Sequence, residues 1–126
     1  MRTLLAVALA FVAAGCSLFD DHERTVIMPV DEVRVAEVAQ AGEPLDATFV
    51  GLLTNGCQQF ERMDVAVSGR SARVTMLARS RTNGGCTADI RYVERTYEFR
   101  PRDSGTFVIE VRQRDGSVTE REIRVE

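Results

Sequence analysis

The sequence predicts an all-β protein with about seven short antiparallel strands packed as a two-sheet sandwich. Three observations predict this class. Segments rich in valine, threonine, phenylalanine and isoleucine recur roughly every 10 to 15 residues, turn residues separate them, and no stretch keeps the helical 3.6-residue period. A small antiparallel β-barrel is the alternative architecture, because it is built from the same alternating strands.

Seven candidate strands follow one another along the chain. Their expected ranges are residues 30–38, 45–53, 59–68, 72–79, 88–99, 106–112 and 118–125. In the fourth strand Val74, Met76 and Ala78 alternate with polar residues and would share the face toward the core. Gly69-Arg70 and Asp115-Gly116 supply turns, and the second pair is the clearest hairpin signal. This pattern is typical of an immunoglobulin or fibronectin type III-like sandwich, although the chain has no tryptophan for an antibody-type core.

The segment 88–99 breaks its own alternation. Ile90 and Tyr92 have one parity, whereas Val93, Tyr97 and Phe99 have the other. A β-bulge inserts one residue and so changes which residues face the core. We therefore expect a bulge or bend after Tyr92.

The first fifteen residues have the features of a signal peptide. Arg2 gives a short positive start, and Leu4 to Ala14 form an apolar run. As a helix this run would cover only about half of a hydrocarbon core roughly 30 Å thick. The segment therefore indicates an export signal and not a membrane span.

The end of this leader, Ala13-Ala14-Gly15-Cys16, resembles the lipobox of bacterial lipoproteins. The resemblance implies that a signal peptidase recognises Ala13, Ala14 and Gly15 and cuts after Gly15. Cys16 would then be the first residue and would carry a diacylglyceryl group and an acylated amine. Its acyl chains, such as palmitate, would insert into the membrane, so that membrane lipid is a partner of the protein. The alternative is an ordinary secretory signal in which the cysteine falls there by chance.

The predicted anchor divides the chain into three parts. Residues 1–15 are the signal peptide, residues 16–27 the lipidated cysteine and a flexible tether, and residues 28–126 the β-sandwich domain. Ser17 stands where the inner-membrane retention signal of enteric bacteria has aspartate. This favours the outer membrane of the bacterial envelope and leaves open whether the domain is periplasmic or on the surface.

The cysteine count then predicts a disulfide. Of the three cysteines, Cys57 and Cys86 remain once Cys16 is assigned to lipid, and the envelope is oxidising. The bond would close a loop of about 30 residues and contribute roughly 3 to 4 kcal/mol in the chain-entropy model. Their places in the strand pattern predict a staple between sheet-edge or end loops. No metal or cofactor is expected, because the only histidine, His22, lies in the tether and no CxxC motif occurs.

A second resemblance covers most of the mature chain. Its motifs are Gly51, Asn55-Gly56-Cys57, Phe60, Cys86-Thr87 and Ser104-Gly105-Thr106-Phe107. This pattern resembles an uncharacterised group of bacterial envelope proteins with an immunoglobulin or fibronectin-like β domain. It implies the fold and the disulfide, and it carries no known active site.

The charged residues give one candidate binding surface. The net charge of −3 is mild and mixed, which does not favour nucleic acid as a partner. An arginine series runs along the fourth and fifth strands: Arg73, Arg79, Arg81, Arg91, Arg95, Arg100 and Arg102. If those strands are neighbours, the first five would form a patch for an envelope protein or an anionic glycan. The alternative is a solvated face on which Glu94, Glu98 and Asp103 pair with the arginines.

The sequence does not favour an enzyme. The only histidine lies in the tether, and Asp64, Glu94, Glu98 and Glu110 occupy the solvent half of alternating strands. We therefore expect a membrane-anchored envelope lipoprotein that acts as a non-catalytic interaction or adhesion module. A structural or assembly accessory of an outer-membrane complex is the alternative, and a hydrolase would need a cleft with convergent polar groups.

Overall fold

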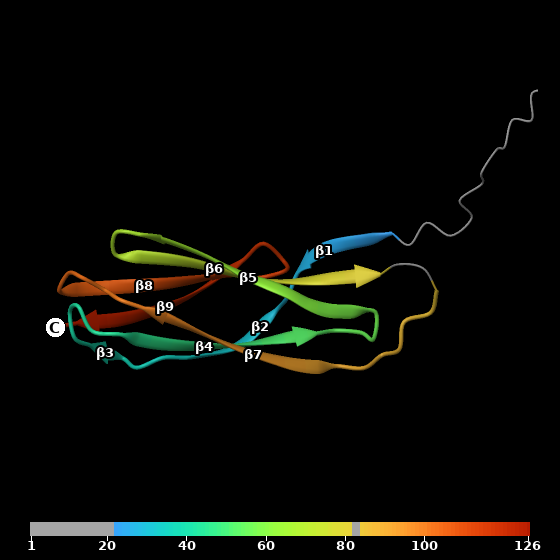
Figure 1. Ribbon diagram of the computed structural model, residues 1–126, viewed down its shortest axis with the longest axis horizontal. Coiled ribbons are helices and arrows are strands. Elements are labelled where there is room, and N and C mark those ends of the chain that lie inside the picture. The colour runs from blue at the N-terminus through green and yellow to red at the C-terminus, as the bar shows by residue number, and fades with distance from the viewer. Residues whose placement is uncertain (1–21, 82–83) are drawn as a thin grey trace, which may run out of the picture.

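A computed structural model describes residues 22–81 and 84–126, and this part of the chain is all β (Figure 1). The strands are β1 (Glu23–Ile27), β2 (Val30–Arg34), β3 (Val38–Ala39), β4 (Leu45–Leu53), β5 (Gln58–Ser68), β6 (Ser71–Arg81), β7 (Arg91–Phe99), β8 (Gly105–Arg112) and β9 (Val118–Val125). They form two open sheets packed face to face, with no closed barrel and no helix in the described residues. The predicted sandwich is confirmed, and the barrel alternative is wrong.

The larger sheet is organised around β6. Strand β5 runs along one edge of β6, while β8 pairs with Ser71–Val74 and β1 with Leu77–Arg81 on the other edge. Strands β9 and β3 extend this sheet beyond β8, and the smaller sheet has the order β2-β4-β7. The β6–β8 and β3–β9 pairs are parallel. The prediction of seven antiparallel strands was therefore incomplete, because it lacked β1, β3 and both parallel pairs.

Strand β1 lies in a segment that the sequence assigned to the tether. Its residues pair with β6 from Glu23↔Arg81 to Ile27↔Leu77, and Val26 packs against the core. The expected tether boundary at residue 27 is therefore wrong, since folded structure already begins at Glu23. The predicted signal peptide and Cys16 lie outside the described residues.

The core fills the space between the two sheets. Its largest fully buried side chains are Phe49, Phe99, Met28, Met76, Ile109, Ile123, Val74 and Val111. Gly51 of β4 leaves room for two of them, because a Cβ there would lie 2.9 Å from Met28 Cε and 3.1 Å from Met76 Cε. The inward alternation predicted for Val74, Met76 and Ala78 is confirmed, since all three are fully buried.

The bulge expected after Tyr92 is not formed. Strand β7 pairs with β4 in unbroken register from Leu45↔Phe99 to Leu53↔Arg91. Because side chains alternate strictly along this continuous ladder, Tyr92 faces outward and is 66% exposed. Ile90, which lies just before β7, is 64% exposed. Register shifts occur instead between Val30 and Glu32 and between Phe60 and Arg62.

Candidate functional site

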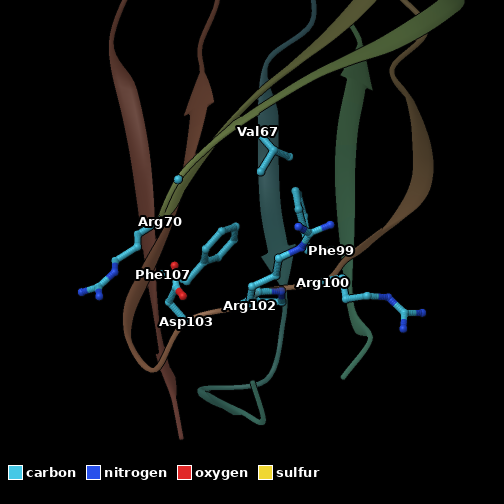
Figure 2. A pocket seen from close by; sticks show the side chains of 9 residues that line it. Val67, Arg70, Phe99, Arg100, Arg102, Asp103 and Phe107 are labelled. Carbon is cyan, nitrogen blue, oxygen red and sulfur yellow. The ribbon is translucent and has the colours of Figure 1, made fainter. Parts of the chain in front are cut away.

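A pocket of about 400 Å³ opens where the β5–β6 turn meets the β7–β8 turn (Figure 2). Its lining residues are Val67, Gly69, Arg70, Phe99, Arg100, Pro101, Arg102, Asp103 and Phe107. We call this part of the molecule the pocket end. It lies at the opposite end of β6 from the row in which Arg81 pairs with Glu23.

The floor of the pocket is aromatic and comes from both sheets. Phe99 ends β7 in the smaller sheet and Phe107 lies on β8 in the larger one, and the two are 2% and 3% exposed. Their ring centroids are 5.8 Å apart with the planes tilted by 57°. Val67 stands at the rim and is 55% exposed, so the pocket offers apolar surface at both depths.

The rim of the pocket is cationic. It carries three arginines, Arg70, Arg100 and Arg102, against one carboxylate, Asp103. Arg100 Nη2 donates to Glu98 Oε1 at 3.2 Å, whereas Arg70 and Arg102 form no ion pair within the described residues. In Figure 2 the side chain of Arg102 extends across the pocket toward Phe99 and Val67.

Gly105 makes room for Arg70. Its φ of 121° is one that residues with a side chain rarely adopt, and a Cβ there would lie 3.1 Å from Arg70 Nη1. A guanidinium offers a rigid fork of N–H donors that matches carboxylate and phosphate groups. Arginines above an apolar floor are therefore suited to bind an anionic group that carries a small apolar neighbour.

The arginine patch expected from the sequence is split between the two sheets. Arg73, Arg79 and Arg81 lie on β6 in the larger sheet, whereas Arg91 and Arg95 lie on β7 in the smaller one. The five therefore do not form the expected common face. The condition for that patch was that the fourth and fifth predicted strands be neighbours, and they are not.

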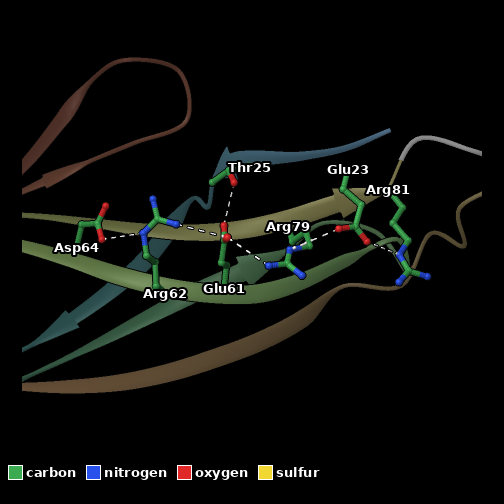
Figure 3. A network of polar contacts seen from close by, with 7 residues as sticks. All are labelled: Glu23, Thr25, Glu61, Arg62, Asp64, Arg79 and Arg81. Carbon is green, nitrogen blue, oxygen red and sulfur yellow. Dashed lines mark hydrogen bonds and ion pairs between the residues drawn. The ribbon is translucent and has the colours of Figure 1, made fainter. Parts of the chain in front are cut away.

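The three arginines of β6 are paired with carboxylates on the outer face of the larger sheet, and Figure 3 shows the pairs of Arg79 and Arg81. Arg81 Nε lies 3.0 Å from Glu23 Oε1, and Arg79 lies 3.7 Å from Glu23 and 3.5 Å from Glu61. Arg73 lies 3.4 Å from Glu110. The alternative of a solvated, ion-paired face is thus what this sheet shows, with partners other than Glu94, Glu98 and Asp103.

The two arginines of β7 turn toward β5 instead. Arg91 donates to the main-chain oxygen of Gln58, and the Arg95 guanidinium lies 4.2 Å from the centroid of the Phe60 ring. Arg95 also donates to the main-chain oxygen of Glu94 at 2.7 Å. These contacts join the edges of the two sheets and leave neither guanidinium to form the predicted patch.

On the outer face of the smaller sheet, one arginine spans all three strands. Arg34 of β2 lies 2.9 Å from Glu32 and 2.9 Å from Glu94 on β7, and hydrogen bonds to these carboxylates raise its pKa further above the ordinary range. Glu32, Val50 and Glu94 share one row of the register, and Val50 is only 5% exposed although it faces outward. The aliphatic stem of a bridging arginine can cover apolar surface in this way.

The predicted disulfide between Cys57 and Cys86 is present, with Cα atoms 5.3 Å apart and a sequence separation of 29. It joins the loop before β5 to the loop before β7, as expected for a bond between end loops. Gly56 N donates to Thr87 O at 2.9 Å beside it, and Gln58 Oε1 accepts from Thr54 N at 2.8 Å. We call this region the disulfide end; it comprises residues 22–24, 54–58, 81 and 84–92.

The hairpin between β8 and β9 fastens the two sheets together. Gln113 uses its side-chain amide to accept from Val30 N at 2.9 Å and donate to Val30 O at 3.0 Å, as a neighbouring strand would. In the same turn Asp115 accepts from the Ser117 hydroxyl at 2.6 Å and the Ser117 N–H at 2.9 Å. These bonds hold the pKa of the Asp115 carboxyl below its usual value, because they stabilise the charged form.

Comparison with known proteins defines the class of this domain. The family model described as the ORF11 beta-sandwich domain matches residues 47–125, which is more than half of the chain. The chain therefore belongs to the ORF11 beta-sandwich domain family. No curated protein and no solved structure matches it.

The described residues contain neither a membrane-spanning helix nor a cluster of metal ligands. No helix among them is long and apolar enough to cross a membrane. No group of three or more histidine, cysteine, aspartate or glutamate side chains in residues 22–81 and 84–126 is arranged to hold a metal ion. The candidate site in this part of the chain is the pocket end, where three arginines line the rim above two buried phenylalanines.

Sequence reasoning did not recognise this pocket. Arg100 and Arg102 were part of the arginine series, and Phe107 was part of a family motif, but Arg70 was assigned only to a turn. The available signal was the cluster from Phe99 to Asp103, where two arginines and a proline follow a core phenylalanine. That cluster does not reveal that the β5–β6 turn lies beside it.

Proposed function

We propose that this protein is a lipid-anchored lipoprotein of the bacterial cell envelope whose β-sandwich is a non-catalytic interaction module. The observation that carries the interaction role is the pocket end, where Arg70 and Arg102 lie beside an apolar floor without an ion pair in the described residues. On the outer face of the larger sheet, Arg73, Arg79 and Arg81 are instead paired with carboxylates. The unpaired guanidinium groups at the pocket end support binding of an anion.

The membrane anchor is supported by the sequence of the leader. A short apolar run ends in Ala13-Ala14-Gly15-Cys16, which resembles a lipobox, and Ser17 favours the outer membrane. The disulfide between Cys57 and Cys86 is compatible with an exported protein, because such bonds persist in oxidising compartments.

The shape of the pocket favours an acidic segment of an envelope protein over an anionic glycan. Sugars bind aromatic residues by stacking on an open ring face, but Phe99 and Phe107 are almost fully buried. They can instead form the bottom of a hollow for one small apolar side chain. We propose that a partner inserts such a side chain and presents a neighbouring carboxylate to Arg70 and Arg102.

The anchor is tested by replacing the acylated residue. Cys16→Ser should abolish incorporation of labelled palmitate and release the protein from the membrane fraction, because it removes the only thiol of the lipobox. The disulfide partners remain intact in this variant and serve as the internal check on folding. Palmitate labelling that persists in the variant would contradict the anchor.

The binding site is tested by photo-crosslinking in intact cells. A photoreactive amino acid at Val67, on the pocket rim, should capture a defined protein, whereas one at Val118, 49% exposed outside the pocket, should not. The capture should be lost in the Arg70→Ala, Arg102→Ala double variant. Matched substitutions at Arg112 and Arg121, exposed arginines outside the pocket lining, should leave it unchanged.

Equal capture at both positions, or capture that survives loss of Arg70 and Arg102, would contradict a role for the pocket. Capture of a glycan and not a protein would support an anion-binding site at the pocket end but would show that the partner is a glycan.

A further inference from the structure

We propose that the disulfide end rests on the lipid surface, with Ile90 and Tyr92 in the interfacial zone, while the pocket end points away from it. This inference rests on the proposed acylation of Cys16, and it adds the orientation of the domain and the surface that touches lipid. Ile90 and Tyr92 are 64% and 66% exposed, the highest values among the exposed large hydrophobic residues of the described chain.

The chain enters the domain at the disulfide end. Strand β1 begins at Glu23, which pairs with Arg81 at the last residue of β6, and Arg81 N donates to Cys57 O at 3.1 Å. Because β1 is part of the sheet, only the segment from Cys16 to His22 joins the anchor to the domain. The seven residue steps from Cys16 to Glu23 span at most about 25 Å when fully extended. The disulfide end is therefore held close to the membrane.

The sandwich is longer than this connection can reach. The turn that carries Arg70 lies at the start of β6, ten residue steps from Arg81. At about 3.3 Å per residue, these steps place the pocket end roughly 33 Å from the point of attachment. The short connection cannot reach around the domain to invert it, so the pocket remains open to partners in solution.

The smaller sheet, across the sandwich from β1, presents apolar surface at the disulfide end. Tyr92 pairs with Leu52 on the outer face of the smaller sheet, and Ile90 lies directly before β7. A tyrosine side chain combines an apolar ring with a polar hydroxyl and suits the boundary between acyl chains and headgroups. An exposed isoleucine and an exposed tyrosine two positions apart at this end are thus suited to a lipid interface.

Charge at the disulfide end permits this contact but does not drive it. The described residues there carry three arginines, Arg24, Arg81 and Arg91, against Glu23 and Asp89. The connecting segment adds Asp20 and Asp21, so this side of the protein has no strong positive potential. The proposed contact is therefore apolar, and salt should affect it little.

A weak contact is sufficient because the anchor makes it intramolecular. A short linker of this kind gives an effective concentration in the millimolar range. Two exposed side chains that would not bind a vesicle by themselves can then stay at the surface for most of the time. Removing the anchor should abolish the contact, whereas removing Ile90 and Tyr92 should leave the protein attached.

The absence of tryptophan in the chain allows a direct test. Acylated full-length Tyr92→Trp and Val67→Trp variants are purified from membranes and placed in vesicles of phosphatidylethanolamine and phosphatidylglycerol. Val67 is the matched control, because it is 55% exposed and lies at the pocket end. The emission at position 92 should shift to shorter wavelength and be largely quenched by lipids brominated on their acyl chains, while the emission at position 67 should not change.

The outcomes separate the orientation from the anchor itself. Palmitate labelling of the same preparations reports acylation, and an intact Cys57–Cys86 bond reports folding. Acylated protein in which position 92 is not quenched would overturn the proposed orientation and leave the anchor standing. Quenching at both positions would show a domain lying flat, and a wavelength shift at position 92 without quenching would show contact with protein, such as a second copy; both results would overturn it.

Discussion

The two ends of this sandwich are held together by different means. At the disulfide end, a covalent bond and directional hydrogen bonds join the loops, including those from Arg91 to Gln58 O and from Gly56 N to Thr87 O. At the pocket end, the two sheets meet through the packing of Phe99 against Phe107, and the polar side chains above them are largely unpaired. Arg91 thus bonds to the main chain at the disulfide end, whereas Arg70 and Arg102 at the pocket end form no ion pair in the described residues.

The separation of the two ends allows a small domain to combine stability with recognition. A domain of about 100 residues buries only about two-thirds of its unfolded surface, so it has little stability to spare. A binding site needs donors without internal partners, and such donors add nothing to the folded state until a ligand arrives. Placing the crosslink at the opposite end allows the pocket end to remain open.

The largest expected effect comes from the floor of the pocket. Phe99→Ala should lower the free energy of unfolding by about 3 to 5 kcal/mol, because it removes a buried aromatic ring and leaves a cavity. Urea unfolding of the purified domain measures the change. Tyr92→Ala, on the same strand but 66% exposed, is the control and should stay within about 0.5 kcal/mol. A loss below about 1 kcal/mol for Phe99→Ala would mean that packing is not what holds this end.

The disulfide should rank second and act locally. Cys57→Ser with Cys86→Ser should cost about 3 to 4 kcal/mol, since the closed loop of the unfolded chain gains freedom. A reducing agent should have the same effect on the wild type and none on the variant. Amide hydrogen exchange should accelerate at residues 54–58 and 87–91 under native conditions before it does at Phe99 and Phe107. Equal acceleration at both ends would refute their separate support.

The hairpin between β8 and β9 should give an intermediate effect. Gln113→Ala removes both side-chain hydrogen bonds to Val30 and leaves two partly buried main-chain groups unpaired. We expect a loss of about 1 to 3 kcal/mol in thermal or urea unfolding. Gln59→Ala, an exposed residue of β5, is the matched control. A value near zero would show that water replaces the amide at no cost.

The strands that sequence reasoning found best are those whose alternation is complete. The ranges 45–53 and 118–125 coincide with β4 and β9, because each has a buried face that fixes its register. The disulfide was predictable as well, since the cysteine arithmetic left only one pair. Strand β1 was missed because only Val26 and Ile27 of its five residues are apolar, too few to show an alternating pattern, and because it forms by pairing with the edge of β6.

The binding surface was less predictable for a physical reason. Sequence shows which arginines exist, but pairing with carboxylates depends on which strands become neighbours. The strands carrying Arg79 and Arg91 were expected to adjoin, and they lie in different sheets. The prediction of a bulge after Tyr92 was wrong for a similar reason. It assumed that Ile90 and Tyr92 face the core, whereas both side chains are exposed. The pairing between distant strands therefore decides which charged residues become neighbours, and the local sequence pattern does not show it.

The smallest expected change in stability comes from an arginine on the rim of the pocket. Arg102→Ala at the pocket end should alter the free energy of unfolding by no more than about 0.5 kcal/mol, because its side chain is exposed and has no ion pair in the described residues. Arg91→Ala at the disulfide end should cost about 1 to 2 kcal/mol, because its guanidinium holds the Gln58 carbonyl of the opposite sheet. Both are exposed arginines that follow or begin β7, so the difference measures their partners and not their chemistry. If Arg102→Ala proved as destabilising as Arg91→Ala, the rim of the pocket would be part of the scaffold, and its guanidinium groups would no longer be free to recognise an anion.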